Sequence, residues 1–249
     1  MSLSSHDYRK AFRGWIRPGW ATAIVLLFVF SSVRFVLVLQ ANVNDNYQYI
    51  SYFFVMMILL PFVCLNGQGQ KSIGIDKVSS WKGIGWGAFF GVVSCTLLFG
   101  LMNWFYGKTD ANAFTYISHT YKELPEVMDS QSRLMYFAIF AGVSMLFSPL
   151  GEELFYRGLI HENIAFEVGH NNASVIDSLA FSLVHLSHFG IVYLDGSWQF
   201  LFWPSILWML GLYISCRLFY FARVLSGTIL GAIVAHASMA YYIFYHILG

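Results

Sequence analysis

Residues Trp20 to Leu39 read WATAIVLLFVFSSVRFVLVL, and this stretch decides the fold class. The hydrocarbon core of a bilayer is about 30 Å thick, so a helix needs roughly 20 apolar residues to cross it. The stretch has that length, and Arg34 is its one charged residue. Basic residues precede it, but it is longer than the apolar region of a signal peptide, and no small-residue cleavage pattern follows. We therefore predict an uncleaved membrane helix.

The composition of the whole chain is typical of a membrane protein. Of the 249 residues, 57% are hydrophobic and only 11% are charged, whereas soluble domains average about 25% charged residues. The net charge of +1 and the lack of a basic stripe exclude nucleic acid as a partner. Cys64, Cys95 and Cys216 are far apart, in or beside apolar runs. We expect buried thiols there, not a disulfide framework or a Cys-x-x-Cys metal site.

Further apolar stretches predict an all-α, polytopic transmembrane bundle of about seven membrane-spanning helices. Basic residues cluster before the first stretch, after the second and between the sixth and seventh, which places the N-terminus on the cytoplasmic side. Residues 1–249 are interpreted as a single integral membrane domain, with room for a re-entrant or interfacial helix between residues 108 and 133. The predicted spans are Trp20–Leu39, Tyr47–Leu65, Ile84–Tyr106, Leu134–Leu150 continuing into a pair of glutamates, Ala173–Tyr193, Phe200–Tyr220 and Leu225–Leu248.

The segment GEELFYRG at residues 151–158 follows the fourth apolar stretch. Ionisable groups within a membrane are costly, so they are functional candidates by default. On a helix Glu153 and Arg157 are four apart on one face, in the favourable order for an ion pair. Glu152 points about 100° away from Glu153 and has no local cationic partner. We therefore predict that Glu152 is the free carboxylate that takes a proton or polarises water. Taken alone, the segment fits a solvated helix end equally well.

Histidines lie inside two later apolar stretches. His185 is in the middle of the fifth predicted span, with Phe181 one turn before it and His188 one turn after it. A lone histidine on an apolar helix is more often a structural group than a ligand, but two imidazoles on one face make that interpretation less fitting. His236 lies near the middle of the last span, among small residues that leave room for another group. Arg34 also needs a partner within the membrane, and we give it only a structural role.

Together these three elements resemble the motifs of the CPBP family of intramembrane proteases. That family contains the type II CAAX-prenyl endopeptidases and Abi-like bacteriocin-processing or self-immunity enzymes. The resemblance rests on Glu-Glu-x-x-x-Arg at residues 152–157, Phe-x-x-x-His at residues 181–185 and His236. It covers about residue 134 to the C-terminus, so residues 134–249 would be the catalytic core.

The resemblance implies hydrolysis of a peptide bond within the bilayer. Glu152 with His185 would activate a water, and His236 would stabilise the oxyanion. The sequence departs from the family pattern at Ala240, where the family usually has Asn or another polar residue. The second oxyanion donor would then be absent, or come from Ser238, His188 or a backbone amide. The supporting residues implied are Glu153, Arg157, Phe181 and His188.

The sequence leaves open whether a metal takes part. Glu152, His185 and His236 are a possible ligand set for Zn²⁺ with an open water position, and the same groups can also activate water directly. The His-Glu-x-x-His signature of zinc peptidases is missing, because Ala165 stands where the second histidine after His161-Glu162 belongs. The sequence fits a protein without a cofactor, and it equally fits one that binds a divalent metal such as zinc. We favour the metal-independent glutamate mechanism.

The sequence supports functions of three classes. The first is an endopeptidase whose partner is a membrane-anchored or lipidated peptide: a prenylated C-terminus, a hydrophobic leader or a C-terminal sorting tag. The second is a proton-coupled transporter, since intramembrane Glu and His also form proton relays, although no internal repeat is evident. The third is a catalytically silent immunity or chaperone protein with this fold, an alternative that Ala240 supports. The expected location is a prokaryotic cell membrane rather than the endoplasmic reticulum.

Overall fold

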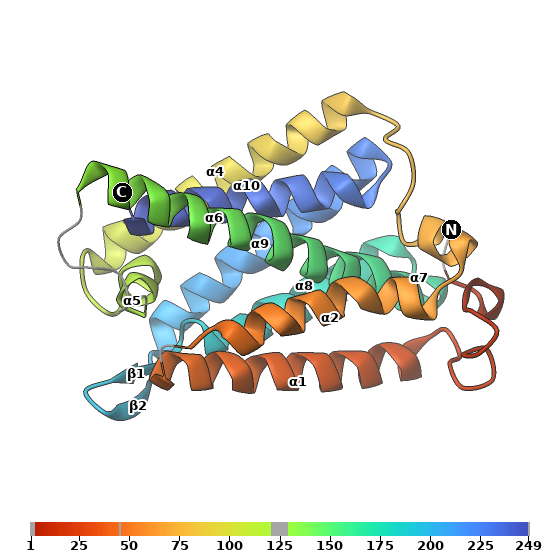
Figure 1. Ribbon diagram of the computed structural model, residues 1–249, viewed down its shortest axis with the longest axis horizontal. Coiled ribbons are helices and arrows are strands. Elements are labelled where there is room, and N and C mark those ends of the chain that lie inside the picture. The colour runs from red at the N-terminus through yellow and green to blue at the C-terminus, as the bar shows by residue number, and fades with distance from the viewer. Residues whose placement is uncertain (1–2, 45, 121–128, 249) are drawn as a thin grey trace.

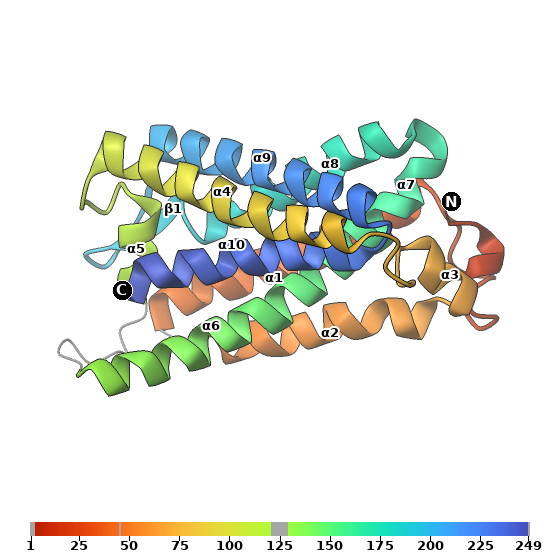
Figure 2. The same cartoon turned by 90° about the horizontal axis from the view of Figure 1, so that it is seen from above.

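Helices form most of the chain in the computed structural model. The structure describes residues 3–44, 46–120 and 129–248; the side chains at 130, 133, 136, 137, 139–144 and 241–248 lie outside the description. The long helices run roughly along the longest axis of the molecule (Figures 1 and 2). These long helices are α1 (Trp20–Asn44), α2 (Gln48–Cys64), α4 (Trp81–Tyr106), α6 (Ser130–Glu152), α9 (Phe202–Ser226) and α10 (Ile229–Leu248).

Shorter elements connect the long helices and lie mainly toward the two ends of the molecule (Figure 1). Glu153–Ile160, labelled η2, is a π-helix that continues directly from α6. Two strands form an antiparallel hairpin at the end of the molecule where α5 also lies. The short elements are η1 (Ser5–Asp7), α3 (Gly67–Ser72), α5 (Ala113–His119), η2 (Glu153–Ile160), α7 (His161–Val168), α8 (His170–Val184), η3 (His185–Ser187), β1 (Ile191–Leu194) and β2 (Ser197–Phe200).

Local sequence signals set the ends of the long helices. Ser80 caps α4 by accepting a hydrogen bond from the Gly83 amide at 3.2 Å, and Gly107 ends the helix with a φ of 55°, which favours glycine. Asp129 caps α6 by accepting the Ser132 amide at 2.7 Å. That hydrogen bond lowers the pKa of the exposed Asp129 carboxyl, because it stabilises the charged form.

Three of the helices are long and apolar enough to cross a membrane, namely α1, α4 and α9, among the residues that the structure describes. Helix α2 and the first part of α10, Ile229–Ala240, are shorter apolar helices. The predicted all-α, membrane-like architecture therefore agrees with the structure. The total of seven spans stays a prediction.

The fifth predicted span, Ala173–Tyr193, was wrong as a continuous helix. Helix α8 ends at Val184, and β1 begins at Ile191. The two strands pair with Leu194 opposite Ser197, so Asp195 and Gly196 form a two-residue turn, and both have positive φ. An Asp-Gly pair between apolar segments is a strong hairpin signal. Between residues 108 and 133, where the sequence leaves room for an extra helix, the structure has the short helix α5, and residues 121–128 lie outside the described residues.

Helix α10 lies at the centre of the bundle and contacts α4, α6 and α9. Its approach to α4 depends on glycines, since a Cβ at Gly87 would meet the Gly231 carbonyl oxygen at 2.7 Å, and a Cβ at Gly91 would overlap the Ala235 carbonyl oxygen. Small residues allow membrane helices to approach this closely. The backbone of α10 next to His236 is thereby held against α4.

The Gly91→Ala variant tests this packing. The added methyl group would overlap the backbone of α10, so we expect a loss of stability of about 1–3 kcal/mol. Gly100 is on the same helix with open space around its Cα, and Gly100→Ala should leave stability unchanged or raise it by up to about 1 kcal/mol. Thermal unfolding of both variants in detergent measures the difference. Equal stabilities would contradict the packing described here.

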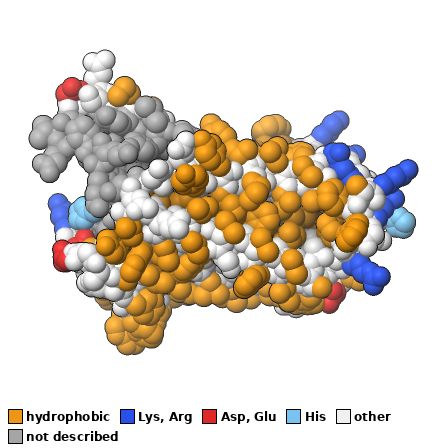
Figure 3. Space-filling model, turned by 60° about the horizontal axis from the view of Figure 1, so that its bottom comes forward, with side chains coloured by type: hydrophobic (Ala, Val, Ile, Leu, Met, Phe, Trp, Pro, Cys, Tyr) orange, Lys and Arg blue, Asp and Glu red, His pale blue; other side chains and the backbone are white. Residues whose placement is uncertain are grey.

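The surface of the molecule has an apolar middle and a basic end. Hydrophobic side chains cover most of the middle in the view of Figure 3, while Lys and Arg gather at the end that holds the described N-terminal segment. Exposed hydrophobic side chains of this kind include Phe28 on α1, Leu97 on α4 and Val224 on α9, at 73%, 63% and 57% exposed. Contiguous apolar surface of this extent is typical of a lipid-facing protein.

Candidate active site

Four segments that are distant in the sequence bring their ionisable side chains together inside the bundle. Helix α6 ends with Glu152, and η2 contributes Glu153 and Arg157, all three of them fully buried. His185 lies where α8 passes into η3, and His236 lies on α10. The fourth segment is α1, which carries Arg34. The candidate residues from all three sequence motifs thus occupy one buried cluster, together with a residue for which the sequence showed no specific role.

The Glu-Glu segment is wider than an α-helix. Residues Glu153–Ile160 form a π-helix directly after α6, and Pro149 lies inside the last turn of α6. π-Helical turns are rare and frequent at functional sites. Helical periodicity in the sequence predicted an ordinary α-helix here, because one widened turn leaves little trace in the hydrophobic pattern. The i to i+4 pairing of Glu153 with Arg157 is nevertheless present.

Glu153 forms the structural side of the cluster. Its Oε1 lies 3.2 Å from Arg157 Nη1 and 2.8 Å from His236 Nδ1. A carboxylate only accepts hydrogen bonds, so His236 donates its Nδ1 proton to Glu153. The Arg157 guanidinium also lies 4.5 Å from the ring centre of Phe181, a cation–π distance. Glu153 therefore fixes both Arg157 and the orientation of the His236 ring.

Phe181 fills the space between the two candidate histidines. Its ring stacks on His185 with the ring centres 4.2 Å apart, and it meets His236 edge-on at 5.6 Å. Phe219 stacks on His236 at 5.1 Å. Aromatic rings packed in this way restrict the rotation of the two imidazoles. The apolar members of the cluster thus hold the reactive groups in place.

Glu152 has a cationic partner, contrary to the sequence-based expectation. Its Oε1 lies 2.6 Å from Arg34 Nη2, and both side chains are almost fully buried. Its Oε2 accepts a hydrogen bond from Ser148 at 3.1 Å and lies 3.7 Å from His236 Nε2. The prediction of a partner-free carboxylate considered only residues near Glu152 in the sequence, whereas Arg34 reaches it from another helix.

Arg34 also joins Glu152 to the histidines of α8 and η3. Arg34 Nη2 lies 3.1 Å from His185 Nε2 and 3.3 Å from His188 Nε2. His185 Nδ1 lies 2.7 Å from the Phe181 carbonyl oxygen, which can only accept, so Nδ1 carries the proton and Nε2 accepts from Arg34. The other guanidinium nitrogens, Nε and Nη1, are buried and have no hydrogen-bond partner among the described residues. The signal that marked Arg34 in the sequence was its charge in the middle of an apolar helix.

Two of the alternative oxyanion donors, His188 and Ser238, have other neighbours in the structure. His188 Nε2 faces an arginine, and since guanidinium only donates, this nitrogen is an acceptor. The Cβ of Ser238 lies beside Gly91 of α4, so this residue is at the contact between α4 and α10. Ala240 cannot donate a hydrogen bond. Among the described residues, the donor closest to Glu152 is Arg34, at 2.6 Å.

A divalent metal does not fit Glu152, His185 and His236 in this arrangement. The Arg34 guanidinium lies within hydrogen-bond distance of both Glu152 and His185. It occupies the space between the oxygen and the nitrogen that would bind the ion, and its positive charge opposes another cation there. Glu152, His185 and His236 would therefore act on water directly, without a metal ion between them.

Comparison with known protein families gives a match over the C-terminal part of the chain. A family model described as Rce1-like type II CAAX prenyl endopeptidase matches residues 134–242, a segment that includes Glu152, His185 and His236. Proteases of this family act on membrane-associated peptide substrates. No curated protein and no solved structure matches the chain. The match over residues 134–242, together with the motifs inside it, supports membership of the CPBP family of intramembrane proteases.

Proposed function

We propose that this protein is an intramembrane endopeptidase that cleaves a membrane-associated peptide. Its substrate would be a prenylated C-terminus, a hydrophobic leader or a C-terminal sorting tag. The observation that carries the proposal is the buried cluster in which Arg34, Glu152, His185 and His236 meet from four segments of the chain. Buried charge is expensive to maintain in a membrane and marks functional sites there.

In the proposed reaction Glu152 acts as the base. A water oxygen attacks the carbonyl carbon of the peptide bond, and the water proton passes to Glu152 while the carbonyl electron pair moves to oxygen. The single lone pair of His185 Nε2 accepts from Arg34 in the structure, so this nitrogen orients the water after the Arg34 contact is released. Glu152 then gives the proton to the leaving nitrogen as the carbon–nitrogen bond breaks. The products are a carboxylate-ended fragment and an amine-ended fragment.

The developing oxyanion would be stabilised by His236 and Arg34. His236 already donates from Nδ1 to Glu153, so its Nε2 donates to an oxyanion only when the ring carries both protons. Arg34 is always charged, and its Nε and Nη1 lack partners among the described residues. These two nitrogens would donate the second hydrogen bond to the oxyanion, which the alanine at position 240 cannot donate. The proposed catalytic unit therefore includes α1 in addition to residues 134–249.

The proposed membrane orientation places the basic end in the cytoplasm. The Lys and Arg side chains gather at the end with the described N-terminal segment (Figure 3), which agrees with the positive-inside rule for a cytoplasmic N-terminus. The proposal keeps seven spans, although α8, with 15 residues, is shorter than the roughly 20 residues that a full crossing needs. A crossing at this position would have to combine α8 with η3 and the hairpin.

A cleavage assay tests the proposed function. Purified protein in lipid vesicles is given two fluorogenic peptides, one farnesylated near its C-terminus and one an unmodified hydrophobic leader. We expect the wild type to cleave at least one, and His185→Ala to be slower by about 10²-fold or more. His119→Ala, which alters an exposed histidine far from the cluster, should cleave like the wild type. Equal rates for the wild type and His185→Ala would reject the proposal.

A catalytically silent role is the second candidate, and one observation favours it. Arg34 binds Glu152 directly and thereby occupies the carboxylate that should meet water. A protein that binds membrane-associated peptides without cleaving them would keep such a contact permanently. Binding of both peptides by the wild type, with no product from either after long incubation, would support this role.

A further inference from the structure

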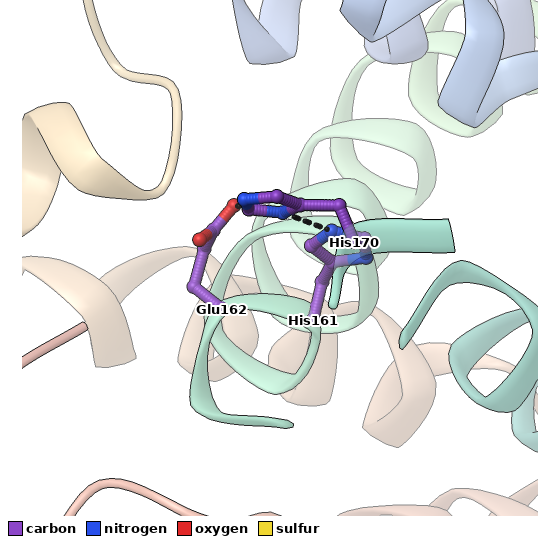
Figure 4. A group of neighbouring side chains, drawn as sticks. All are labelled: His161, Glu162 and His170. Atoms are coloured by element: carbon purple, nitrogen blue, oxygen red, sulfur yellow. Dashed lines mark hydrogen bonds and ion pairs between the residues drawn. The ribbon is translucent and has the colours of Figure 1, made fainter. Parts of the chain in front are cut away.

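A second group of ionisable side chains lies apart from Glu152, where α7 meets α8. His161 and Glu162 begin α7, and His170 begins α8. Gly169 separates the two helices with a φ of 77°, a left-handed conformation that favours glycine and that turns His170 back over His161. Figure 4 shows the three side chains converging. Their ligand atoms all lie within 4.8 Å of one another.

We propose that His161, Glu162 and His170 form a Zn²⁺ site, distinct from the proposed catalytic cluster, with an open position for water. Zinc takes His nitrogen and carboxylate oxygen ligands at about 2.0–2.2 Å, so neighbouring ligand atoms of a tetrahedron lie about 3.4 Å apart. His161 Nε2 and His170 Nδ1 are 3.1 Å apart, and Glu162 Oε1 and His170 Nδ1 are 3.9 Å apart. The His170 side chain is 47% exposed, so a small rotation can adjust its distances to His161 Nε2 and to the other oxygen of Glu162, Oε2, which is the proposed ligand.

The surroundings of His161 are those of a metal ligand. Its Nδ1 lies 2.8 Å from Asp177 Oδ2, and both side chains are fully buried. A carboxylate only accepts, so the Nδ1 proton belongs to His161 and the lone pair of Nε2 points toward His170. Metal-bound histidines almost always donate their other nitrogen in this way, which fixes the ring and strengthens the ligand. In the protein without metal, His170 Nδ1 donates to His161 Nε2, so binding requires His170 to carry its proton on Nε2 instead.

Glu162 has one carboxylate oxygen that accepts no hydrogen bond from the described residues. Arg223 Nη2 donates to its Oε1 at 2.7 Å, whereas Oε2 is buried and has no hydrogen-bond partner among the described residues. Leaving a buried carboxylate oxygen unpaired is costly. A cation bound at Oε2, with Arg223 still on Oε1, satisfies both oxygens.

The charges around the group also favour a cation. The described contacts connect three buried carboxylates, those of Glu153, Asp177 and Glu162, with two arginines, Arg157 and Arg223. Buried carboxylates are normally paired or bind metals. Arg223 balances Glu162, whereas Arg157 is shared by Glu153 and Asp177, so one negative charge is in excess beside His161. The exposed side of His170 gives an ion access from solvent.

The spatial arrangement explains why the sequence pattern missed this group. The zinc-peptidase signature requires the second histidine on the same helix as His161, where Ala165 stands. In the structure His170 takes that place from the next helix. Because Glu162 is held by Arg223 and would be a ligand, it is not free to act as the base of a zinc peptidase. The site proposed here therefore joins α7 to α8 and is not the centre of a zinc peptidase.

Metal binding by the full chain tests the proposal, with Zn²⁺ alone as the probe. The purified protein is stripped with chelator, and bound Zn²⁺ is then measured by titration and elemental analysis. We expect about one Zn²⁺ per chain and a Tm that rises with free Zn²⁺ concentration. His170→Ala should lose both effects, and because this side chain is half exposed, the variant should still fold.

The matched control is His119→Ala, which removes an exposed histidine that lies beside an aspartate, Asp110, on another part of the chain. It should bind Zn²⁺ like the wild type. Failure of the wild type to bind Zn²⁺, or equal binding by wild type and His170→Ala, would overturn the proposal. Both readouts are independent of peptide cleavage, so the outcome does not depend on the proposed function.

Discussion

The Glu152→Gln variant is expected to cleave its peptide substrate about 10²–10⁴-fold more slowly than the wild type, the usual contribution of a general base. Glutamine has nearly the same shape as glutamate: its amide oxygen can replace the oxygen that faces Arg34, and its amide nitrogen can donate to the Ser148 hydroxyl oxygen. It cannot take a proton from water. Measurement of kcat in lipid vesicles, with protein concentration determined after size-exclusion chromatography, gives the comparison.

A second carboxylate serves as the control for Glu152. Glu167 is exposed at the end of α7 and contacts the backbone of Trp20, so Glu167→Gln changes the same chemical group away from the cluster and should retain the wild-type kcat. Glu152→Gln leaves Arg34 without its ion-pair partner and can therefore lower stability. The Tm of the Glu152→Gln variant is measured in parallel to show that it is folded. A folded Glu152→Gln variant with wild-type kcat would rule out Glu152 as the base.

The Arg34→Gln variant is expected to lower kcat by about 10²–10³-fold, the effect of losing one oxyanion donor, with little change in KM. The reason is that Arg34 Nε and Nη1 would meet the oxygen only when it carries negative charge. If Arg34 instead blocks Glu152, the same substitution should raise kcat. The direction of the change therefore separates a catalytic donor from an inhibitory contact.

Two further variants make the test of Arg34 independent of folding. Removing one partner of a buried ion pair costs about 3–5 kcal/mol, so Arg34→Gln is compared with Arg34→Lys, which keeps the charge but loses the planar fork of donors. Arg34→Lys should have an intermediate kcat. Adding Ala240→Asn to Arg34→Gln restores a polar group one turn after His236 and should recover part of the lost rate. No recovery, together with a wild-type kcat for Arg34→Lys, would contradict the proposed donor role.

Much of the helical architecture was predictable from the sequence. Apolar stretches located most of the long helices within a few residues, since each stretch is long and bounded by polar segments. The spacing of Glu153 and Arg157 predicted their ion pair because both residues belong to one helical segment. Residues 152, 185 and 236 could be grouped through the family resemblance, but their distances could not be derived from spacing alone.

The remaining features depend on contacts between distant segments. No residue near Arg34 in the sequence indicates that it binds Glu152. The ion pair forms only because α1 packs against the segment that carries Glu152. The same holds for His170, which replaces the histidine missing at Ala165 only because Gly169 reverses the chain. The hairpin is different, because the pair Asp195-Gly196 indicates a tight turn from the local sequence alone. The apolar residues on both sides of this pair, however, also resemble part of a membrane span.

The contacts of Glu153 continue without a break to the surface of the protein. Glu153 meets Arg157, Arg157 lies 3.8 Å from Asp177, and Asp177 binds His161 beside His170. One chain of contacts therefore connects the surface end to His236 at the other end. If a ligand at the surface end changes peptide affinity by some factor, thermodynamic reciprocity requires that the peptide change the affinity for that ligand by the same factor.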